Sequence, residues 1–249
     1  MGGLSPTSPR PSRSAGEEED GTSVIIPVRN GARFIAEAIG SVQAQLGPGD
    51  DILVVDDGST DGTPRILAGI CQAGLRLLVG GGRGVSAARN LGLAAACGRF
   101  VAFLDHDDMW PPDRHRILLG ALKQDMTLDA AFGRILRRFE PGARVTAESM
   151  VEGHHAYWLV GSGLYRRRLL DRVGGFAEDM PMGEDFDLHA RLVEAGMRSR
   201  LCETYSLIRR HHDANTSNDH GRAVPWRLEF LRRKIARVRA LADNKPGRG

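Results

Sequence analysis

The chain alternates between short apolar runs and longer segments in which apolar residues recur every three or four positions. The apolar runs are short enough to be strands buried on both faces of a sheet, and they lie at residues 23–28, 51–55, 75–79 and 100–104. Helical spacing is found between them, at residues 35–42, 63–73 and 85–96. Because short links join these elements, we expect parallel strands connected by right-handed crossovers, in an α/β, Rossmann-like architecture.

The second half of the chain contains the same kinds of element in a less regular order. Helical spacing continues at residues 113–123, 167–173 and 184–196, and strand patterns occur at residues 130–139, 160–166 and 198–212. The 130–139 segment alternates apolar and polar residues, which favours a strand at an edge of the sheet. Residues 140–160 have the composition of a long loop. Its adjacent histidines, His154 and His155, either line a site or face solvent.

The composition is that of a soluble globular protein. At 249 residues, 41% hydrophobic and 26% charged, the chain is long enough for one sizeable α/β domain or two small ones. Cys71, Cys97 and Cys202 are too far apart for a disulfide framework or a metal site, which fits a reducing compartment. No apolar run approaches ~20 residues, and the N-terminus lacks the layout of a signal peptide. The expected location is therefore the cytoplasm.

The two ends differ from the middle. Residues 1–21 are rich in proline, serine and glycine and end in an acidic run, so we expect a disordered tail. Residues 225–243 predict an amphipathic helix with basic residues around an apolar stripe of Leu228, Leu231, Ile235 and Val238. Such a helix either docks on the domain with its basic face in water or lies peripherally on an anionic membrane, here the inner membrane face. With few aromatic residues and no nucleic-acid motif, no nucleic-acid partner is expected.

Acidic residues follow directly after the apolar run at residues 100–104. Asp105, Asp107 and Asp108 repel one another unless a cation neutralises them. Carboxylate oxygens suit Mg²⁺ or Mn²⁺, which bind through one or two carboxylates together with the phosphates of a substrate. The cluster therefore predicts a divalent-metal site for a nucleotide diphosphate. The alternative is an ordinary turn after a strand, which Pro111 and Pro112 also favour.

Other polar residues are placed to join this site. The second apolar run also ends in acids, the second of which is Asp57. Arg89, near the start of a predicted helix, either reaches a phosphate or base or forms a surface salt bridge. The helix dipole alone explains acids such as Glu184 and Asp185 in a first turn, but a carboxylate there could also act as a general base toward an acceptor hydroxyl. His212, after the last strand pattern, is a candidate metal or phosphate ligand.

Five pieces of the sequence, in this order and spacing, resemble the family 2 glycosyltransferases with the GT-A fold. They are SVIIPVRN, DDILVVDDGSTDGT, GVSAARNLGLAAACGRFVAFLDHDDMWPPDR, GGF and MGEDFDLHARL. The resemblance implies a mixed, mostly parallel sheet flanked by helices in a domain at residues 22–218, with a nucleotide-binding half at 22–115 and an acceptor-binding half at 116–218. The basic helix and tail would occupy residues 219–249. It also implies sugar transfer from a nucleotide-diphosphate donor, usually with inversion and a divalent metal.

The resemblance assigns five residues to the nucleotide. Pro27 and Val28 would line the base pocket, and Asp57 would accept a hydrogen bond from the ring N–H of uracil or thymine. Arg89 would contact the nucleotide or its pyrophosphate. Asp105, the first acid of the D-x-D motif, would lie near the ribose.

The remaining roles concern the metal and the reaction. Asp107 closes the D-x-D motif and would bind Mn²⁺ or Mg²⁺ between the two phosphates, with His212 as a second candidate ligand. Asp185 matches the catalytic base of the family, and its neighbour Glu184 would belong to the nucleotide-sugar site. Inversion requires a base opposite the leaving diphosphate and neutralisation of the charge that develops on it. Two acidic clusters with separate roles are expected for such a transferase.

Some features depart from the family pattern. Arg29 stands where the family often has an aromatic residue, which puts the base or acceptor contacts in doubt. The chain has no Q-x-x-R-W-type motif, so we expect transfer of one sugar rather than processive synthesis. The acceptor, a glycan, lipid-linked glycan, natural product or peptide, stays open, and oligomerisation or the basic helix would supply its surface. Two alternatives remain: a sugar-phosphate nucleotidyltransferase and an inactive nucleotide-sugar-binding module.

Overall fold

A computed structural model of the chain describes residues 21–70, 74–143, 159–180, 182–213, 215 and 223–243, and the side chains of 223–225 and 241–243 are not among the described features. Several sequence predictions lie outside these residues. They concern the tail before Gly21, Cys71, and the two histidines His154 and His155. Among the described residues, no helix combines the length and the apolar character needed to cross a membrane.

The described strands form one seven-stranded sheet. Its order is β3-β2-β1-β4-β6-β5-β7. The strands are β1 (Thr22–Val28), β2 (Asp51–Asp56), β3 (Leu75–Val79), β4 (Phe100–Phe103), β5 (Ala130–Phe139), β6 (Gly163–Arg166) and β7 (Ser199–His211). Within this sheet only β6 runs antiparallel to its neighbours β4 and β5. The expected mixed, mostly parallel sheet is confirmed.

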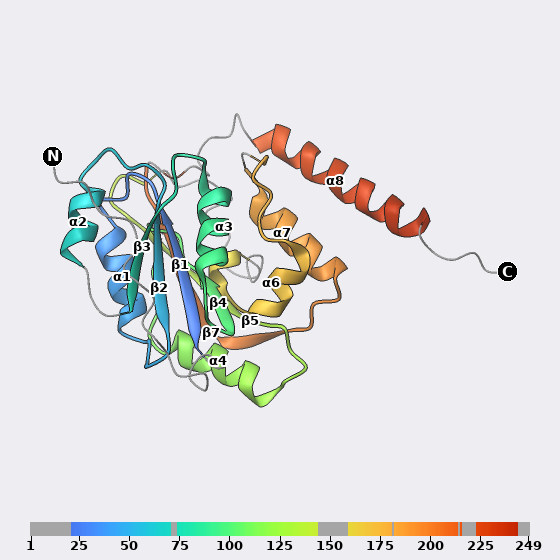
Figure 1. The fold of residues 1–249 in the computed structure, drawn as a ribbon, viewed down its shortest axis with the longest axis horizontal. Coiled ribbons are helices and arrows are strands. Elements are labelled where there is room, and N and C mark those ends of the chain that lie inside the picture. Colours follow the sequence, from blue (N-terminus) through green and yellow to red (C-terminus); the bar gives the residue numbers. More distant parts are fainter. Residues whose placement is uncertain are drawn as a thin grey trace.

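Helices cover both faces of the sheet (Figure 1). One hydrophobic cluster joins α1, α2 and α4 to side chains such as Val24 and Ile26 of β1. A second cluster joins α3, α6 and α7 to the opposite face, through Ile25 of the same strand. The helices are α1 (Ile35–Gln43), α2 (Thr63–Gly69), α3 (Val85–Ala95), α4 (Arg114–Gln124), α6 (Arg167–Val173), α7 (Glu184–Glu194) and α8 (Ala223–Asp243), with a short 3₁₀ turn, η1 (Val160–Ser162).

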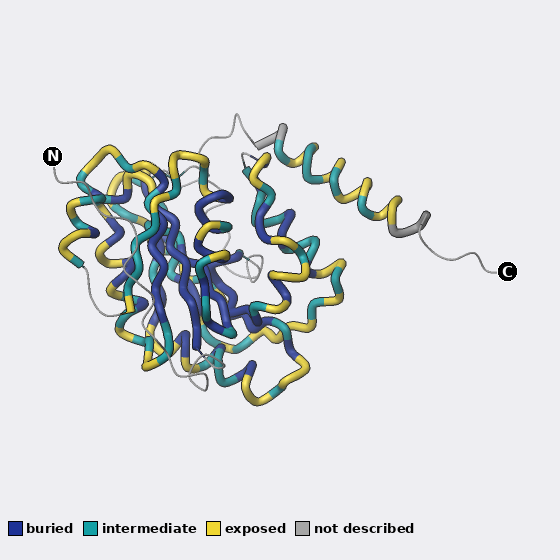
Figure 2. Tube along the Cα trace, viewed as in Figure 1, coloured by how far each residue is buried: buried dark blue, intermediate teal, exposed yellow. Residues whose placement is uncertain are grey.

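The central strands are buried on both faces, which explains why their sequences are continuously apolar. Every residue of β1 and of β4 is buried, and Figure 2 shows this buried centre between more exposed helices. Because successive side chains point to opposite faces, alternate residues of β1 contribute to the two clusters. The carboxyl ends of the parallel strands therefore meet at one edge, where polar loops follow them.

Three sequence predictions about elements were wrong in detail. The segment at Ala130–Phe139 is not an edge strand, because the 13-residue strand β7 pairs along its outer side while its first residues pair with β6. Helix α2 ends at Gly69 rather than at residue 73. The apolar stripe of α8 does not dock on the domain: Leu228, for example, is 63% exposed.

Candidate active site

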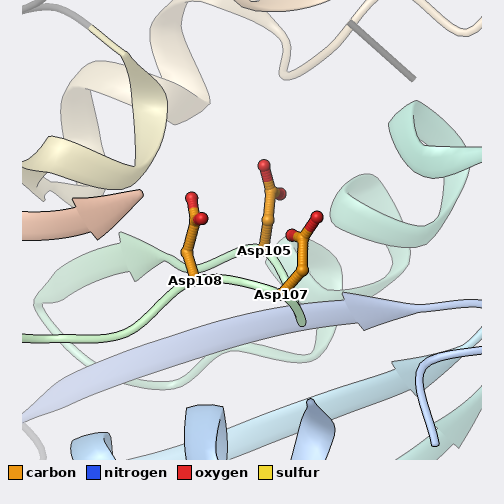
Figure 3. A group of neighbouring side chains, drawn as sticks. All are labelled: Asp105, Asp107 and Asp108. Atoms are coloured by element: carbon orange, nitrogen blue, oxygen red, sulfur yellow. The ribbon is translucent and has the colours of Figure 1, made fainter. Parts of the chain in front are cut away.

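Three carboxyl groups follow β4 at the carboxyl end of the sheet. Asp105, Asp107 and Asp108 each offer a carboxylate oxygen, and these atoms lie within 4.8 Å of one another. Figure 3 shows the three side chains rising from one loop toward the same side. The backbone N–H of Asp108 donates to the carbonyl of Asp105 at 3.0 Å, which closes the loop into a tight turn. The cluster predicted from the sequence is thus present in the fold.

Asp107 is joined to the end of β7. Its Oδ2 lies 3.1 Å from Nε2 of His212 and accepts a hydrogen bond from Asn215 at 3.2 Å. Burial raises the pKa of Asp107, but the His212 hydrogen bond and the charge of His106 outweigh it, so the pKa lies below its usual value. The ring of Phe34 packs against His212 at 4.8 Å between centroids. Asp107 is therefore held as a carboxylate beside an imidazole.

The donor set around Asp107 fits a divalent cation. Two adjacent ligands of an octahedral ion with bonds of about 2.1 Å lie about 3 Å apart. The 3.1 Å between Asp107 Oδ2 and His212 Nε2 matches that separation. Carboxylate oxygens with one imidazole suit Mn²⁺, and carboxylates with water suit Mg²⁺. The carboxylate of Asp105 is more exposed than that of Asp107 and faces the same space.

Asp108 has a different role from its neighbours. It is buried, and its Oδ1 accepts the backbone N–H of Arg210 at 2.9 Å. Burial, followed by the charges of Asp107 and Asp105, raises the pKa of Asp108 well above its usual value. The backbones also pair, because Met109 and Ile208 form an antiparallel bridge. Asp108 thus fixes the acidic loop to β7, which brings His212 to Asp107.

Arg89 of α3 joins the acids of two elements. Its Nη2 donates to Asp105 at 2.6 Å, and its Nη1 donates to Glu184 at 2.8 Å and to Asp185 at 3.1 Å. Its guanidinium also lies over the Phe176 ring, 5.1 Å from the centroid. The side chain is almost fully buried. Burial lowers the pKa of Arg89, but the three acids outweigh it and raise the pKa above its usual value. Sequence reasoning did not find this shared contact.

Asp185 is the second residue of α7 and faces the acidic cluster across Arg89. Burial has the largest influence and raises the pKa of Asp185. Arg89 lowers this pKa, and the nearby acids Glu184 and Asp105 raise it. The resulting pKa is about 7. The helix begins after Gly183, whose positive φ of 82° turns the chain sharply into the first turn. Asp185 is therefore a carboxyl group that changes protonation state near neutral pH, as a general base requires.

Asp57 at the end of β2 contacts the loop before α3. Its Oδ1 accepts the backbone N–H of Arg83 at 2.9 Å, and its Oδ2 accepts that of Gly84 at 2.7 Å. Pro27 and Val28 end the neighbouring strand β1, and the carbonyl of Val28 accepts the backbone N–H of Asp57 at 2.8 Å. Asp57 is buried, and it orders the glycine-rich loop beside the strand ends.

The structure thus gathers the sequence-predicted residues into three neighbouring groups. One comprises Asp105, Arg89, Glu184 and Asp185, another Asp107 and His212, and the third Pro27, Val28 and Asp57. Sequence reasoning missed Asn215, because nothing in its polar loop distinguishes it from its neighbours.

Comparisons with known proteins show the family of this chain. The family model described as glycosyl transferase family 2 matches residues 23–188. The succinoglycan biosynthesis protein ExoO of Rhizobium meliloti is 33% identical over 194 residues, which cover 70% of this chain and 56% of ExoO. The pre-mycofactocin glycosyltransferase of Mycobacterium tuberculosis is 34% identical over 221 residues, covering 82% of this chain and 45% of that protein. The chain spans about half the length of these curated relatives.

Solved structures share the fold. Residues 1–349 of S. aureus TarS, in complex with UDP, superpose with a TM-score of 0.62 at 25% identity, covering 76% of this chain and 60% of that one. The mannosyltransferase PcManGT of Pyrobaculum calidifontis, in complex with GDP-Man and Mn²⁺, gives a TM-score of 0.62 at 24% identity, covering 91% of this chain and 65% of that one. The expected GT-A architecture is thereby confirmed.

Proposed function

The chain belongs to glycosyl transferase family 2, and from this premise we propose that it transfers one sugar from a nucleotide-diphosphate donor to an acceptor hydroxyl, with inversion and with a divalent cation. One observation carries the proposal: the acids of the site form two groups with different surroundings. Asp107 lies beside His212, whereas Asp185 is half-buried beside Arg89 and has a pKa of about 7. The first group suits a cation, and the second suits a proton acceptor.

The donor would occupy the carboxyl ends of β1, β2 and β4. Pro27 and Val28 would line the base pocket, with Asp57 beside a uracil or thymine ring. The two backbone N–H groups that donate to Asp57 keep its carboxylate oriented. Asp105 would lie by the ribose. Neighbours of the same fold are described with UDP and with GDP-Man, so the fold itself is compatible with more than one base.

Asp107 and His212 would hold Mn²⁺ or Mg²⁺. When bound, the cation would neutralise the negative charge that develops on the leaving diphosphate. Until it binds, the His212 hydrogen bond and the charge of His106 keep the pKa of Asp107 below its usual value, so its carboxylate stays charged. The anchoring of Asp108 to Arg210 keeps the loop rigid, so the ligands need little rearrangement.

Asp185 would take the proton of the acceptor hydroxyl. For inversion, the hydroxyl oxygen bonds to the anomeric carbon from the side opposite the diphosphate, and the hydroxyl proton moves to an Oδ of Asp185. The bond between the anomeric carbon and the diphosphate oxygen breaks, and the nucleoside diphosphate leaves with its electron pair. Arg89 holds the Oδ1 atom of Asp185 at 3.1 Å and ties it to Asp105 of the donor side. Arg89 is thus a positioning residue that sets the distance between the base and the donor. Glu184 accepts a further hydrogen bond from the Arg89 guanidinium. If Arg89 also contacts the nucleotide, its guanidinium must bind the nucleotide and these acids at the same time.

A ligand-stabilisation experiment tests the donor and the metal together. Thermal unfolding is followed with a panel of nucleotide sugars, each with and without Mn²⁺. Because a ligand stabilises with the logarithm of its concentration over Kd, we expect a rise in Tm with a UDP- or dTDP-sugar plus Mn²⁺. Asp107→Ala should lose this rise, whereas the control Asp171→Ala, an exposed acid of α6, should keep it.

Other outcomes would contradict the proposal. If no nucleotide sugar raises Tm, the proposal that the chain binds a nucleotide-diphosphate donor is wrong. If the rise in Tm persists in Asp107→Ala, the assignment of Asp107 as a metal ligand is wrong. Release of pyrophosphate from a nucleoside triphosphate and a sugar phosphate would instead identify a nucleotidyltransferase.

A further inference from the structure

Helix α8 turns an apolar stripe away from the rest of the protein. Figure 1 shows this helix lying outside the layered domain, beyond α7. Its stripe comprises Leu228, Leu231, Ile235 and Val238, which are 63%, 50%, 50% and 53% exposed. Apolar residues at this helical spacing normally face a core. In α8 they face solvent, so the helix presents an apolar surface that nothing among the described residues covers.

The opposite side of α8 is the one that holds the domain. The Trp226 ring packs on Phe186 of α7 at 4.9 Å between centroids, and it lies so close to Gly183 that a Cβ there would clash with it. Farther along, Arg233 pairs with Asp179 at 2.6 Å. Aromatic and ionic contacts, rather than the aliphatic stripe, therefore attach the helix.

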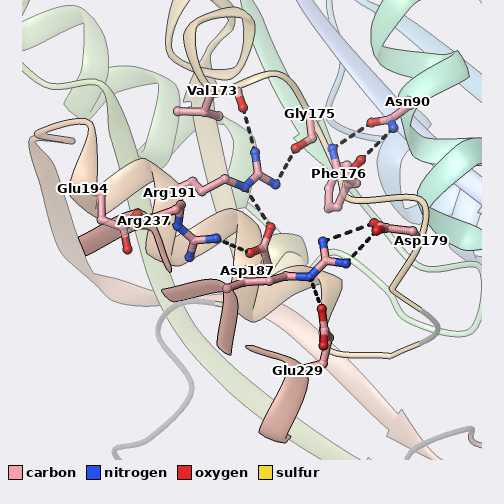
Figure 4. A network of polar contacts seen from close by, with 11 residues as sticks. Asn90, Val173, Gly175, Phe176, Asp179, Asp187, Arg191, Glu194, Glu229 and Arg237 are labelled. Carbon is pink, nitrogen blue, oxygen red and sulfur yellow. Dashed lines mark hydrogen bonds and ion pairs between the residues drawn. The ribbon is translucent and has the colours of Figure 1, made fainter. Parts of the chain in front are cut away.

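A second ionic contact fixes the rotation of α8. Figure 4 shows Arg237 and Arg191 reaching Asp187 from two helices. Arg237 donates to Asp187 at 2.8 Å and to Glu194 at 2.7 Å, and Arg191 donates to Asp187 at 2.8 Å. Asp187 is buried, so breaking the contact with Arg237 would leave part of its charge uncompensated. The apolar stripe is thus held outward by a network on the other side.

Basic residues border the stripe on both sides. At about 100° per residue, the stripe lies about opposite Trp226, Arg233 and Arg237. Arg227 and Lys234 fall along one border, and the other border carries Arg232 and Arg239. Glu229, an acid in this stretch, lies toward the docked side, where it pairs with Arg233 at 2.8 Å, and it also pairs with the mostly exposed Arg232 of the border at 3.5 Å. The outward half of the helix, as far as its side chains are described, is therefore apolar in the middle and positive at both edges.

This pattern argues against a second copy of the chain as the occupant. The stripe has the three-four-three spacing of a coiled-coil seam, and the basic residues take the positions that flank such a seam. Pairing two copies, parallel or antiparallel, would place positive charges against positive charges along both borders. An anionic surface meets the same pattern without repulsion.

We propose that the outward face of α8 binds the surface of an anionic lipid bilayer. The four aliphatic side chains enter the boundary between headgroups and acyl chains, and the bordering arginines and lysine extend to lipid phosphates. The helix lies in the plane of the surface and does not cross it, in agreement with the absence of a described helix able to span a membrane. This assignment rests on the surface of α8 and holds whatever reaction the domain catalyses.

Vesicle sedimentation of the full chain tests the assignment. We expect binding to phosphatidylcholine vesicles that contain phosphatidylglycerol, weak binding to phosphatidylcholine alone, and loss of binding as salt increases. The double variant Leu231→Gln, Ile235→Gln removes the centre of the stripe, and Arg232→Gln, Arg239→Gln removes one border. Each should weaken binding about tenfold or more.

Two controls match these variants. Val79→Gln removes an apolar side chain that is 71% exposed on β3, and Arg200→Gln removes a half-exposed positive charge of β7. Both should bind vesicles as the unaltered chain does. Because all the altered side chains face solvent, Tm should stay unchanged, which separates lost binding from lost folding.

Three results would overturn the assignment. They are absence of binding to anionic vesicles, equal binding to neutral vesicles, and unchanged binding by either double variant. Light scattering without lipid measures the oligomeric state. If the unaltered chain is a dimer and the double variant Leu231→Gln, Ile235→Gln is a monomer, a second copy of the chain covers the stripe and the assignment to a bilayer is wrong.

Discussion

The carboxyl group of Asp185 is subject to opposing influences that leave it near the midpoint of its titration at neutral pH. Burial and the acids Glu184 and Asp105 favour the protonated form, and Arg89 favours the ionised form. A carboxylate with a much lower pKa would be a weaker base, and one with a much higher pKa would be protonated at neutral pH and could not accept the proton. A pKa of about 7 therefore suits the transfer of a hydroxyl proton at physiological pH.

Replacing Asp185 by Asn should remove the proton acceptor and keep the donor site. The amide has nearly the shape of the carboxyl group, so the donor should still raise Tm in the presence of Mn²⁺. The rate of transfer should fall by about 10²–10⁴-fold, the usual contribution of a positioned general base. Asp171→Asn is the matched control. Steady-state kinetics with a donor found by the thermal screen measure the loss, and an unreduced kcat would favour a binding module or another base.

The pH dependence of transfer should follow Asp185. Because the ionised carboxylate is the active form, kcat should rise with pH and level off above about 7, where the pKa of Asp185 lies. Arg89 lowers that pKa, so Arg89→Gln should move the midpoint to higher pH, whereas Arg89→Lys keeps a positive charge and should move it less. A midpoint near 7 in Arg89→Gln would mean that Arg89 has no influence on the ionisation of Asp185.

The sequence predicts the kinds of side chain in the site better than their partners. Asp105 and Asp107 are recognisable because they follow a buried apolar run, and Asp185 because it stands in a recognisable motif at the start of a helix. The three-way contact of Arg89 depends on how closely α3 approaches α7, a distance that helical spacing does not contain. The sequence did offer His212 as a second candidate metal ligand beside Asp107, but their direct contact depends on the register of β7, which the sequence does not give.

Helix α3 approaches the sheet closely because of one small residue. A Cβ at Gly92 would lie closer to Cγ2 of Ile25, a fully buried residue of β1, than van der Waals contact allows. The close approach places Arg89, one turn earlier on α3, beside the strand ends. A glycine in the middle of a helix costs up to about 1 kcal/mol, so packing accounts for its presence here.

Gly92→Ala should therefore destabilise the protein. Overpacking costs about 1–3 kcal/mol and the gain in helix propensity is about 1 kcal/mol, so the free energy of unfolding should fall by up to about 2 kcal/mol. Gly40→Ala in α1 is the control, because nothing lies within 4 Å of its added Cβ, and it should leave stability equal or raise it. Urea denaturation measures both. Equal effects of the two variants would show that α3 can move away from β1 without cost.

Element types were easier to predict from the sequence than their neighbours in space. The alternation of apolar and polar residues in β5 suggested an edge strand. The first residues of β5 pair with β6 on one side and β7 on the other, whereas from Arg134 onward the pairing is with β7. In α8 the aliphatic stripe suggested the docked face, but ion pairs on the opposite face decide the orientation. Neither sheet order nor long-range ion pairs leave a periodic signal in a single sequence.

The nucleotide-binding and acceptor-binding halves predicted from the sequence share one sheet and one core. Strand β4 of the first half pairs with β6 of the second, with Phe100 opposite Arg166 and Val101 opposite Tyr165. The core cluster that contains Val24 of β1 also contains Leu118 of α4. Each half therefore completes the core of the other, and we expect the described domain to unfold in one cooperative transition.

A fragment of residues 22–115 should consequently fail to fold by itself. It would keep β1 to β4 but end inside α4, and Phe103 would lose its ring contacts with Tyr165 and Phe176, at 6.2 Å and 5.1 Å between centroids. Strand β4 would become an unprotected apolar edge, which favours aggregation. Circular dichroism during heating should show no cooperative transition for this fragment, whereas residues 22–218 should show one. A cooperative transition of the short fragment, with the melting range of the longer one, would mean that the first half carries a complete core.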